Sequence, residues 1–189
     1  RLLRDKGSMR GMITDASATF ESVQEVLKKE ETSLLVEKTS ITKPYIVPGE
    51  GARVVIIDLG MKQTILHELT NLQCHVTVVP YDTSAEDILR FKPDGVLLSN
   101  GPGNPTFVQT TIETVQALLG EIPIFGIGLG HQIFAQACGA NITKLNHGNY
   151  GNSFPVKDLA IDKTWITTQS RQYYVAEATI ENTDLTVTF

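Results

Sequence analysis

From residue 53 onward, short apolar runs alternate four times with amphipathic segments. The apolar runs contain almost no polar residues, which is typical of strands that are buried on both faces of a sheet. The segments between them carry hydrophobic side chains at three- and four-residue spacing, which is typical of amphipathic helices. Strands that alternate with helices form parallel sheets with helices on both faces. The sequence therefore predicts an α/β fold with a mainly parallel sheet flanked by helices.

The expected elements can be placed on the sequence. We expect strands at 53–58, 75–79, 95–99 and 122–127, and helices at 63–72, 83–91, 110–119 and 132–138. The second helix should open with a capping box in which Thr83 is the cap and Glu86 its partner. Beyond residue 140 we expect short strands without helices between them, at 142–145, 154–156, 164–168 and 185–189.

A segment rich in proline and glycine, residues 42–51, divides the chain. Such segments are typical of linkers between domains. Residues 1–41 precede it and hold an amphipathic helical pattern, but they are too short for a whole domain. We therefore expect an incomplete, smaller N-terminal domain at 1–41, a linker at 42–51 and the main domain at 52–189.

Charge and composition exclude several functional classes. A net charge of −5 gives no electrostatic basis for binding nucleic acid or an anionic membrane. No apolar run approaches the ~18 residues that a membrane-spanning helix needs. The two cysteines, Cys74 and Cys138, lack the spacing of a metal or redox motif, and free thiols fit a reducing cytoplasm. No metal site is expected, because His67 and His131 have no ligand partner three or four residues away.

Two glycine-rich loops follow the third and fourth predicted strands. They span residues 100–105 (Asn-Gly-Pro-Gly-Asn-Pro) and 126–131 (Gly-Ile-Gly-Leu-Gly-His). In open α/β sheets, ligands bind outside the carboxyl ends of the strands. Both loops should lie at those ends, so together they form the candidate functional site.

The loop at 126–131 allows several interpretations. A dinucleotide site is disfavoured, because His131 stands where the third glycine belongs and no Asp or Glu occurs at 144–152, about 20 positions on. The phosphate-loop motif Gly-x-x-x-x-Gly-Lys-[Ser/Thr] is absent from the sequence. A tight turn that uses glycine only for its backbone freedom stays possible. The last interpretation is a nucleophile elbow, in which two glycines flank a residue whose side chain is lifted above the sheet. Here the middle residue, Gly128, has no side chain.

The residues around this loop resemble class I glutamine amidotransferases. Pro123-Ile-Phe-Gly-Ile-Gly-Leu-Gly-His-Gln132 is similar to that family's Pro-hydrophobic-Phe-Gly-Ile-Cys-Leu-Gly-His-Gln motif. Three further stretches are similar to the carbamoyl-phosphate synthase small subunits within the family: Lys43-Pro-Tyr-Ile-Val-Pro-Gly49, Ser99-Asn-Gly-Pro-Gly-Asn-Pro105 and Phe154-Pro-Val-Lys-Asp-Leu159. The resemblance covers nearly the whole chain.

The resemblance implies a flavodoxin-like amidotransferase domain and a function in glutamine hydrolysis. The ammonia would pass to a large synthetase subunit, which would carry the ATP and Mg²⁺, so no cofactor is expected in this chain. In such enzymes a cysteine at the elbow attacks the amide of L-glutamine, a histidine acts as its base and a glutamate orients the histidine. Whether the pathway served is arginine or pyrimidine biosynthesis stays open.

The resemblance also assigns roles to individual residues. The backbone N–H groups of Gly103 and Leu129 would form the oxyanion hole. The positions expected to hold glutamine are Gly101, Gly103, Leu129, Gln132, Ser170, Gln172 and Tyr173. Two of them depart from the family pattern, since Ser170 stands for asparagine and Gln172 for glycine. If Gln172 had to adopt a positive φ, its backbone would be strained.

The largest departure from the family is Gly128, which stands at the position of the nucleophilic cysteine. Without the thiol no thioester can form, and by analogy with deletion of a triad serine the loss of turnover would be roughly 10⁵–10⁶-fold. The family's His-Pro-Glu segment is expected beyond Phe189, and residues 146–154 also depart from the family pattern. Three interpretations stay open: a non-catalytic paralogue that binds an ammonia-using synthetase, an active small subunit with a substitution at position 128, and a glutamine-binding module.

Overall fold

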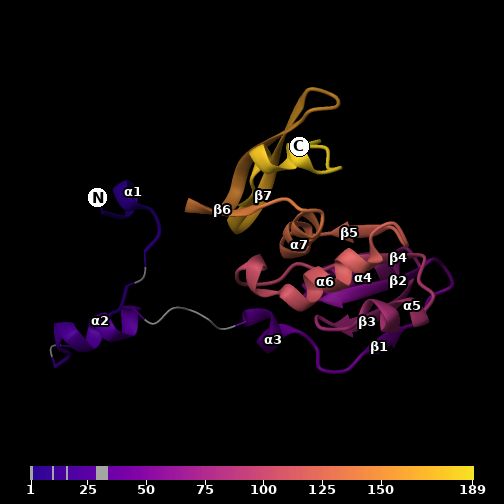
Figure 1. Ribbon diagram of the computed structural model, residues 1–189, viewed down its shortest axis with the longest axis horizontal. Coiled ribbons are helices and arrows are strands. Elements are labelled where there is room, and N and C mark those ends of the chain that lie inside the picture. Colours follow the sequence, from indigo (N-terminus) through magenta and orange to yellow (C-terminus); the bar gives the residue numbers. More distant parts are fainter. Residues whose placement is uncertain (1, 10, 16, 29–33) are drawn as a thin grey trace.

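The computed structural model describes all residues except 1, 10, 16 and 29–33, and its centre is a five-stranded sheet (Figure 1). The strands are β1 (Tyr45–Val47), β2 (Arg53–Asp58), β3 (His75–Pro80), β4 (Gly95–Leu98) and β5 (Ile124–Gly126), in the order β1-β3-β2-β4-β5. β2 pairs in parallel with β3 and β4, and β4 pairs in parallel with β5. The predicted α/β fold with a mainly parallel sheet is confirmed.

Helices cover both faces of the sheet. They are α4 (Gln63–Asn71), α5 (Ala85–Arg90), α6 (Gln109–Leu118) and α7 (Leu129–Ala137). Successive strand residues point to opposite faces. Ile57 therefore packs in a buried cluster that includes residues of α5, α6 and α7, whereas Ile56 packs with Leu66 of α4 in a second cluster. Each face of the sheet thus has its own hydrophobic core.

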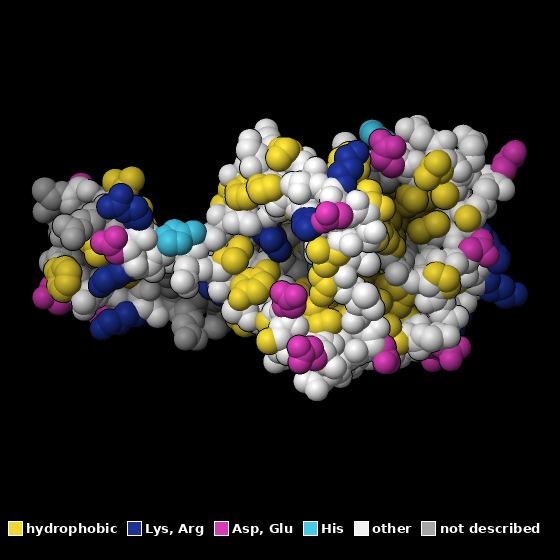
Figure 2. Space-filling view, turned by 90° about the horizontal axis from the view of Figure 1, so that it is seen from above, with side chains coloured by type: hydrophobic (Ala, Val, Ile, Leu, Met, Phe, Trp, Pro, Cys, Tyr) yellow, Lys and Arg dark blue, Asp and Glu magenta, His cyan; other side chains and the backbone are white. Residues whose placement is uncertain are grey.

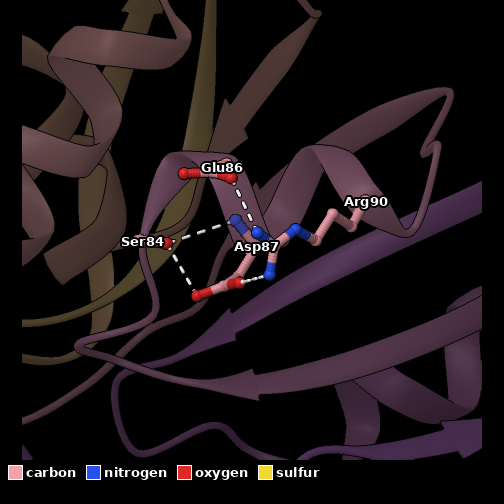
Figure 3. Close-up of polar contacts among 4 residues, drawn as sticks. All are labelled: Ser84, Glu86, Asp87 and Arg90. Atoms are coloured by element: carbon pink, nitrogen blue, oxygen red, sulfur yellow. Dashed lines mark hydrogen bonds and ion pairs between the residues drawn. The ribbon is translucent and has the colours of Figure 1, made fainter.

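The start of α5 corrects the predicted capping box (Figure 3). Ser84, rather than Thr83, is the cap, and its Oγ accepts a hydrogen bond from the N–H of Asp87 at 3.2 Å and donates to the Asp87 carboxylate at 2.8 Å. Thr83 is unavailable because its hydroxyl donates to the carbonyl of Pro80. The side chain of Glu86 instead pairs with Arg90 at 2.7 Å.

The segment predicted as a linker contributes a strand to the sheet. β1 pairs with β3 in antiparallel register, with Ile46 opposite Thr77. Just before it lie helix α3 (Leu35–Thr39) and Ile41, whose N–H donates to the carboxylate of Asp58 at 2.8 Å. Asp58 is buried and also accepts the N–H groups of Gly60 and Met61. This carboxylate holds the incoming chain against the carboxyl end of β2.

After the sheet, the chain forms one long hairpin instead of several short strands. β6 (Ile142–Asp158) and β7 (Lys163–Val175) are antiparallel, with register shifts between Lys144 and Asn149 and between Gly151 and Phe154. A short 3₁₀ helix, η2 (Glu177–Asn182), follows. The predicted strand at 185–189 is wrong: these residues form no ladder, and the carbonyl of Thr188 accepts only a single hydrogen bond from the N–H of Leu159.

The N-terminal segment lies against this hairpin at one point. It contains α1 (Leu2–Lys6) and α2 (Phe20–Lys28), and neither helix has a buried residue. The N–H of Ser8 donates to the carbonyl of Asn146 at 2.8 Å, and the ring of His147 hydrogen-bonds to the carbonyl of Leu3. The predicted domain at residues 1–41 includes residues outside the described part of the chain, and the division into domains stays a prediction.

The surface carries both signs of charge. On the face seen in Figure 2, Lys and Arg side chains are interspersed with Asp and Glu. Within the described part of the chain, no helix combines the length and the apolar character needed to cross a bilayer.

Candidate functional site

A cavity of about 850 Å³ lies over the carboxyl ends of β4 and β5. Its walls are the loop after β4, the turn between β5 and α7, the hairpin β6–β7, the start of α3 and the segment after α1. All eight residues singled out in the sequence line it: Gly101, Gly103, Gly128, Leu129, Gln132, Ser170, Gln172 and Tyr173. The fold therefore brings residues separated by more than 70 positions in the sequence into one site.

The turn at 126–130 has the geometry of an elbow. Added Cβ atoms at Gly126 and Gly130 would collide with backbone, at Gly126 with the N–H nitrogen of His131 at 2.6 Å and at Gly130 with the carbonyl of Leu98. Gly128 differs, because its nearest neighbour would be the Asn100 side chain at 3.6 Å, an ordinary contact. Its backbone, at φ 58° and ψ −109°, lies in a region that L residues rarely adopt. Positions 126 and 130 have no space for a Cβ atom and therefore require glycine, whereas position 128 has room for a side chain.

Two backbone N–H groups at the cavity wall have no hydrogen-bond acceptor among the described residues. One belongs to Leu129, the first residue of α7, and the other to Gly103, which adopts a φ of 92°. The two loops touch, since a Cβ on Gly101 would lie 2.9 Å from Leu129 Cδ2. Free N–H groups at a helix start attract negative charge. The pair is thus suited to hold an oxygen that carries negative charge.

Ser99 and Asn100 fasten the loop after β4 in place. Ser99 is fully buried, and its Oγ accepts the N–H of Leu59 at 2.9 Å while its carbonyl accepts the N–H of Gly130 at 3.1 Å. The side chain of Asn100 accepts the N–H of Lys62 at 3.0 Å. These bonds join the ends of β2 and β4 to the elbow, so the free N–H groups are held on rigid elements.

The hairpin supplies the wall opposite the elbow. The side-chain amide of Gln132 donates to the carbonyl of Tyr173 at 2.8 Å, which links α7 to β7. Ser170 lies opposite Tyr150 in the hairpin, and both line the cavity. Gln172 is not among the residues with positive φ, so the anticipated strain is absent. A glutamine side chain is accommodated there in ordinary extended backbone.

Several lining residues were missed by the sequence analysis. Ser8, Met9 and Leu35 come from the N-terminal third of the chain, and only long-range packing places them at the site. Lys144 and Arg171 also line the cavity. Arg171 lies between Ser170 and Gln172, two positions at which the resemblance places glutamine, so its position at the site follows from the same local signal.

His131 has a perturbed environment at the cavity wall. The residue is exposed overall, but desolvation of the ring at the cavity wall, and secondly the positive charge of Arg171, lower the pKa of its imidazole from the ordinary value of 6.5. Near neutral pH this ring is therefore uncharged and can accept or donate a hydrogen bond.

No cysteine lies at the elbow. Cys74 is buried in the hydrophobic cluster under α4, and Cys138 follows the last residue of α7, at the end opposite Gly128. Burial and the charge of Asp184 raise the pKa of the Cys138 thiol, which makes it a poor nucleophile. Among the residues that the structure describes, no group of three or more His, Cys, Asp or Glu side chains could hold a metal ion.

The comparisons with known proteins show to which family this fold belongs. Residues 55–189 match the family model "Glutamine amidotransferase class-I", and the chain belongs to this family. Its sequence is similar to carbamoyl phosphate synthase small chains. It is 49% identical to that of Oceanobacillus iheyensis over 189 residues, which are 100% of this chain and 52% of the relative. It is 48% identical over 189 residues (100% and 52%) to the pyrimidine-specific small chain of Halalkalibacterium halodurans. The chain thus spans about half the length of the curated relatives it matches.

Solved structures support the same fold. A Thermoplasma acidophilum protein described as part of a GMP synthase superposes with a TM-score of 0.58 at 21% identity, over 68% of each chain. A glutamine amidotransferase from Methylobacillus flagellatus superposes with a TM-score of 0.51 at 14% identity, over 66% of this chain and 56% of that one. At these identities the likeness concerns the fold alone.

Proposed function

We propose that this chain is the amidotransferase part of a carbamoyl-phosphate synthase small subunit, and that Gly128 occupies the position of its nucleophile. The similarity to small chains over the full length of the sequence supports the first part. One relative is named pyrimidine-specific, so pyrimidine biosynthesis is the pathway we propose, with arginine biosynthesis as the alternative. We expect the protein in the cytoplasm.

One observation carries the second part of the proposal. Gly128 sits in a strained elbow conformation, yet a Cβ there would meet nothing closer than 3.6 Å. A glycine chosen only for tight packing would be crowded, as Gly126 and Gly130 are. A site with space, free N–H donors and no nucleophile can bind an amide but cannot form the thioester. Loss of the nucleophile alone lowers turnover by roughly 10⁵–10⁶-fold.

The proposed remaining role is to bind a large synthetase subunit that uses free ammonia. The large subunit, with ATP and Mg²⁺, would make carbamoyl phosphate, while this chain would stabilise or regulate it and bind L-glutamine without hydrolysing it. A module that binds glutamine alone, with no association to a large subunit, is the alternative.

The test is reconstitution of the protein with its large subunit. The proposal predicts a stable complex that makes carbamoyl phosphate from ammonia but not from glutamine. Glutamine-dependent synthesis at ordinary rates would contradict the loss of glutaminase activity. Glutamine binding without any association to the large subunit would favour the isolated binding module.

The variant Gly128→Cys in the full-length protein tests whether the site has lost only its nucleophile or other functional residues as well. Rescue of glutamine-dependent synthesis would mean that the remaining machinery is intact and that position 128 alone was lost. A folded but inactive variant would mean that changes such as Ser170 and those at 146–154 have removed the activity as well.

A further inference from the structure

The charges that line the cavity are all of one sign. Lys144 and Arg171, on neighbouring strands of the hairpin, are the charged side chains among the described residues that line it. None of the described residues that line the cavity is Asp or Glu. Although the chain as a whole carries a net charge of −5, this cavity is basic. A concave site lined by one sign of charge concentrates ligands of the opposite sign.

The two cations are not neutralised by the protein itself. Within the described part of the chain, neither Lys144 nor Arg171 has a carboxylate within ion-pair distance. Arg171 donates one hydrogen bond, from Nε to Gln169 Oε1 at 3.1 Å, and its other N–H groups have no acceptor among the described residues. The effect of Arg171 on the pKa of His131 is consistent with its guanidinium charge acting inside the cavity. A bound anion would supply the missing partner.

The loop after β4 and the elbow add neutral donors to the cavity. The free N–H groups of Gly103 and Leu129 favour an oxygen with negative charge over a neutral carbonyl. In a working hydrolase this charge exists only during the reaction. With Gly128 in place of a nucleophile the cavity contains no thiolate that would repel a permanent anion. A carboxylate oxygen carries a negative charge permanently. An amide oxygen acquires such a charge only in the tetrahedral intermediate of hydrolysis.

We propose that this cavity binds a small amino-acid dicarboxylate of the glutamate class in preference to the corresponding neutral amide. One carboxylate would accept from the N–H groups of Gly103 and Leu129, and the ligand's net negative charge would face Lys144 and Arg171. The inference rests on the proposed function in one respect, the absence of a reacting nucleophile at position 128. The chain would then bind the acid rather than consume the amide.

The direct experiment is isothermal titration of the protein with L-glutamate and, separately, with L-glutamine, at low and at high salt. Glutamate should bind about fivefold or more tightly, the advantage that charge-assisted hydrogen bonds give over neutral ones. Its affinity should fall with added salt, because Lys144 and Arg171 are exposed at the cavity mouth, whereas that of glutamine should change little. This comparison uses the unmodified protein and does not depend on the folding of any variant.

Two variants and one control locate the effect. Arg171→Gln and Lys144→Gln should each weaken glutamate binding by about two- to fivefold, the range for partly exposed charge pairs, and should weaken glutamine binding less, because glutamine carries one carboxylate fewer. The control Lys43→Gln removes the same charge from an exposed position outside the cavity and should leave both affinities unchanged.

The outcomes separate this inference from the function on which it rests. Equal or tighter binding of glutamine without release of ammonia would overturn the inference and leave the proposed function standing. Release of ammonia from glutamine would overturn the proposed function. A preference for glutamate that is insensitive to salt and to both cavity variants would also overturn the inference, because the cations would then play no part.

Discussion

The side-chain amide of Gln132 donates a hydrogen bond to the main-chain carbonyl of Tyr173 at 2.8 Å. Gln132 lies on the first turn of α7, which begins at the elbow, and Tyr173 lies on the hairpin strand that forms the opposite wall. Gln132 is 8% exposed, so water competes little for this bond. The bond joins two walls of the cavity.

Gln132→Leu should loosen this connection. The variant removes the donor and leaves the carbonyl of Tyr173 without it, at a cost of about 1–2 kcal/mol in the free energy of unfolding. Hydrogen exchange of the β7 amides should increase in the variant. Gln109→Leu, at an exposed position on α6, is the control and should leave β7 exchange unchanged. Equal exchange in both variants would show that the bond does not hold the hairpin.

The elbow should tolerate side chains very unequally. Gly130→Ala forces a Cβ into the carbonyl of Leu98 and should lower the free energy of unfolding by about 3 kcal/mol. Gly128→Ala meets only backbone strain, because its space is open, and should cost about 1 kcal/mol. Urea unfolding measures both, with Gly11→Ala as a control in open space. A greater loss at position 128 than at 130 would contradict the elbow geometry.

Asp58 should be a principal stabiliser of the loop beside the site. Its buried carboxylate accepts three backbone N–H groups, those of Ile41, Gly60 and Met61. Asp58→Ala leaves these donors without an acceptor and should lower the free energy of unfolding by about 3 kcal/mol or more. Chemical denaturation checks the value. A change within about 0.5 kcal/mol, as at an ordinary surface position, would show that water replaces the carboxylate.

His131 should make stability fall as the solution becomes acidic. Desolvation at the cavity wall, followed by the charge of Arg171, lowers the pKa of His131 in the folded state below its ordinary 6.5. The unfolded chain therefore binds the proton first, and the free energy of unfolding decreases as pH falls from above 6.5 toward the lowered folded pKa. His131→Gln should flatten this dependence in urea unfolding between about pH 8 and pH 5.

Arg171→Gln provides a second check on the same histidine. Removal of the guanidinium charge should raise the pKa of His131 toward its ordinary value, as followed by NMR of the imidazole. Lys43 does not line the cavity, so Lys43→Gln should leave the titration of His131 unchanged. A titration of His131 unaffected by Arg171→Gln would leave burial as the sole cause.

Much of the sheet and its helices could be predicted from the sequence, because strands such as 53–58 are buried on both faces and read as continuous apolar runs. The start of α7 was expected at 132 but lies at Leu129, since the glycine turn itself forms the cap. The hairpin was expected as separate short strands. Its polar, partly exposed residues at 146–153 give little periodic signal, and its pairing across register shifts depends on contacts distant in the sequence.

The candidate site was predictable where it depends on local backbone geometry. Gly126, Gly128 and Gly130 form a turn whose spacing alone suggests an elbow. The contribution of Ser8, Leu35 and Lys144 was not predictable in this way, because separate packing events bring each of them to the cavity. The site is basic because the fold brings Lys144 and Arg171 to one cavity. The net charge of the chain, −5, gives no sign of this.

We propose that position 128 is a nucleophile elbow without its nucleophile. The most direct measurement is the rate of alkylation of the variant Gly128→Cys by iodoacetamide as a function of pH, with protection by glutamine or glutamate. A thiol at the start of α7, facing the cavity, should ionise below the ordinary pKa of about 8.5 and react well before Cys74 and Cys138. A thiol that ionises at or above about 8.5, or that reacts no faster than these two cysteines, would contradict the claim.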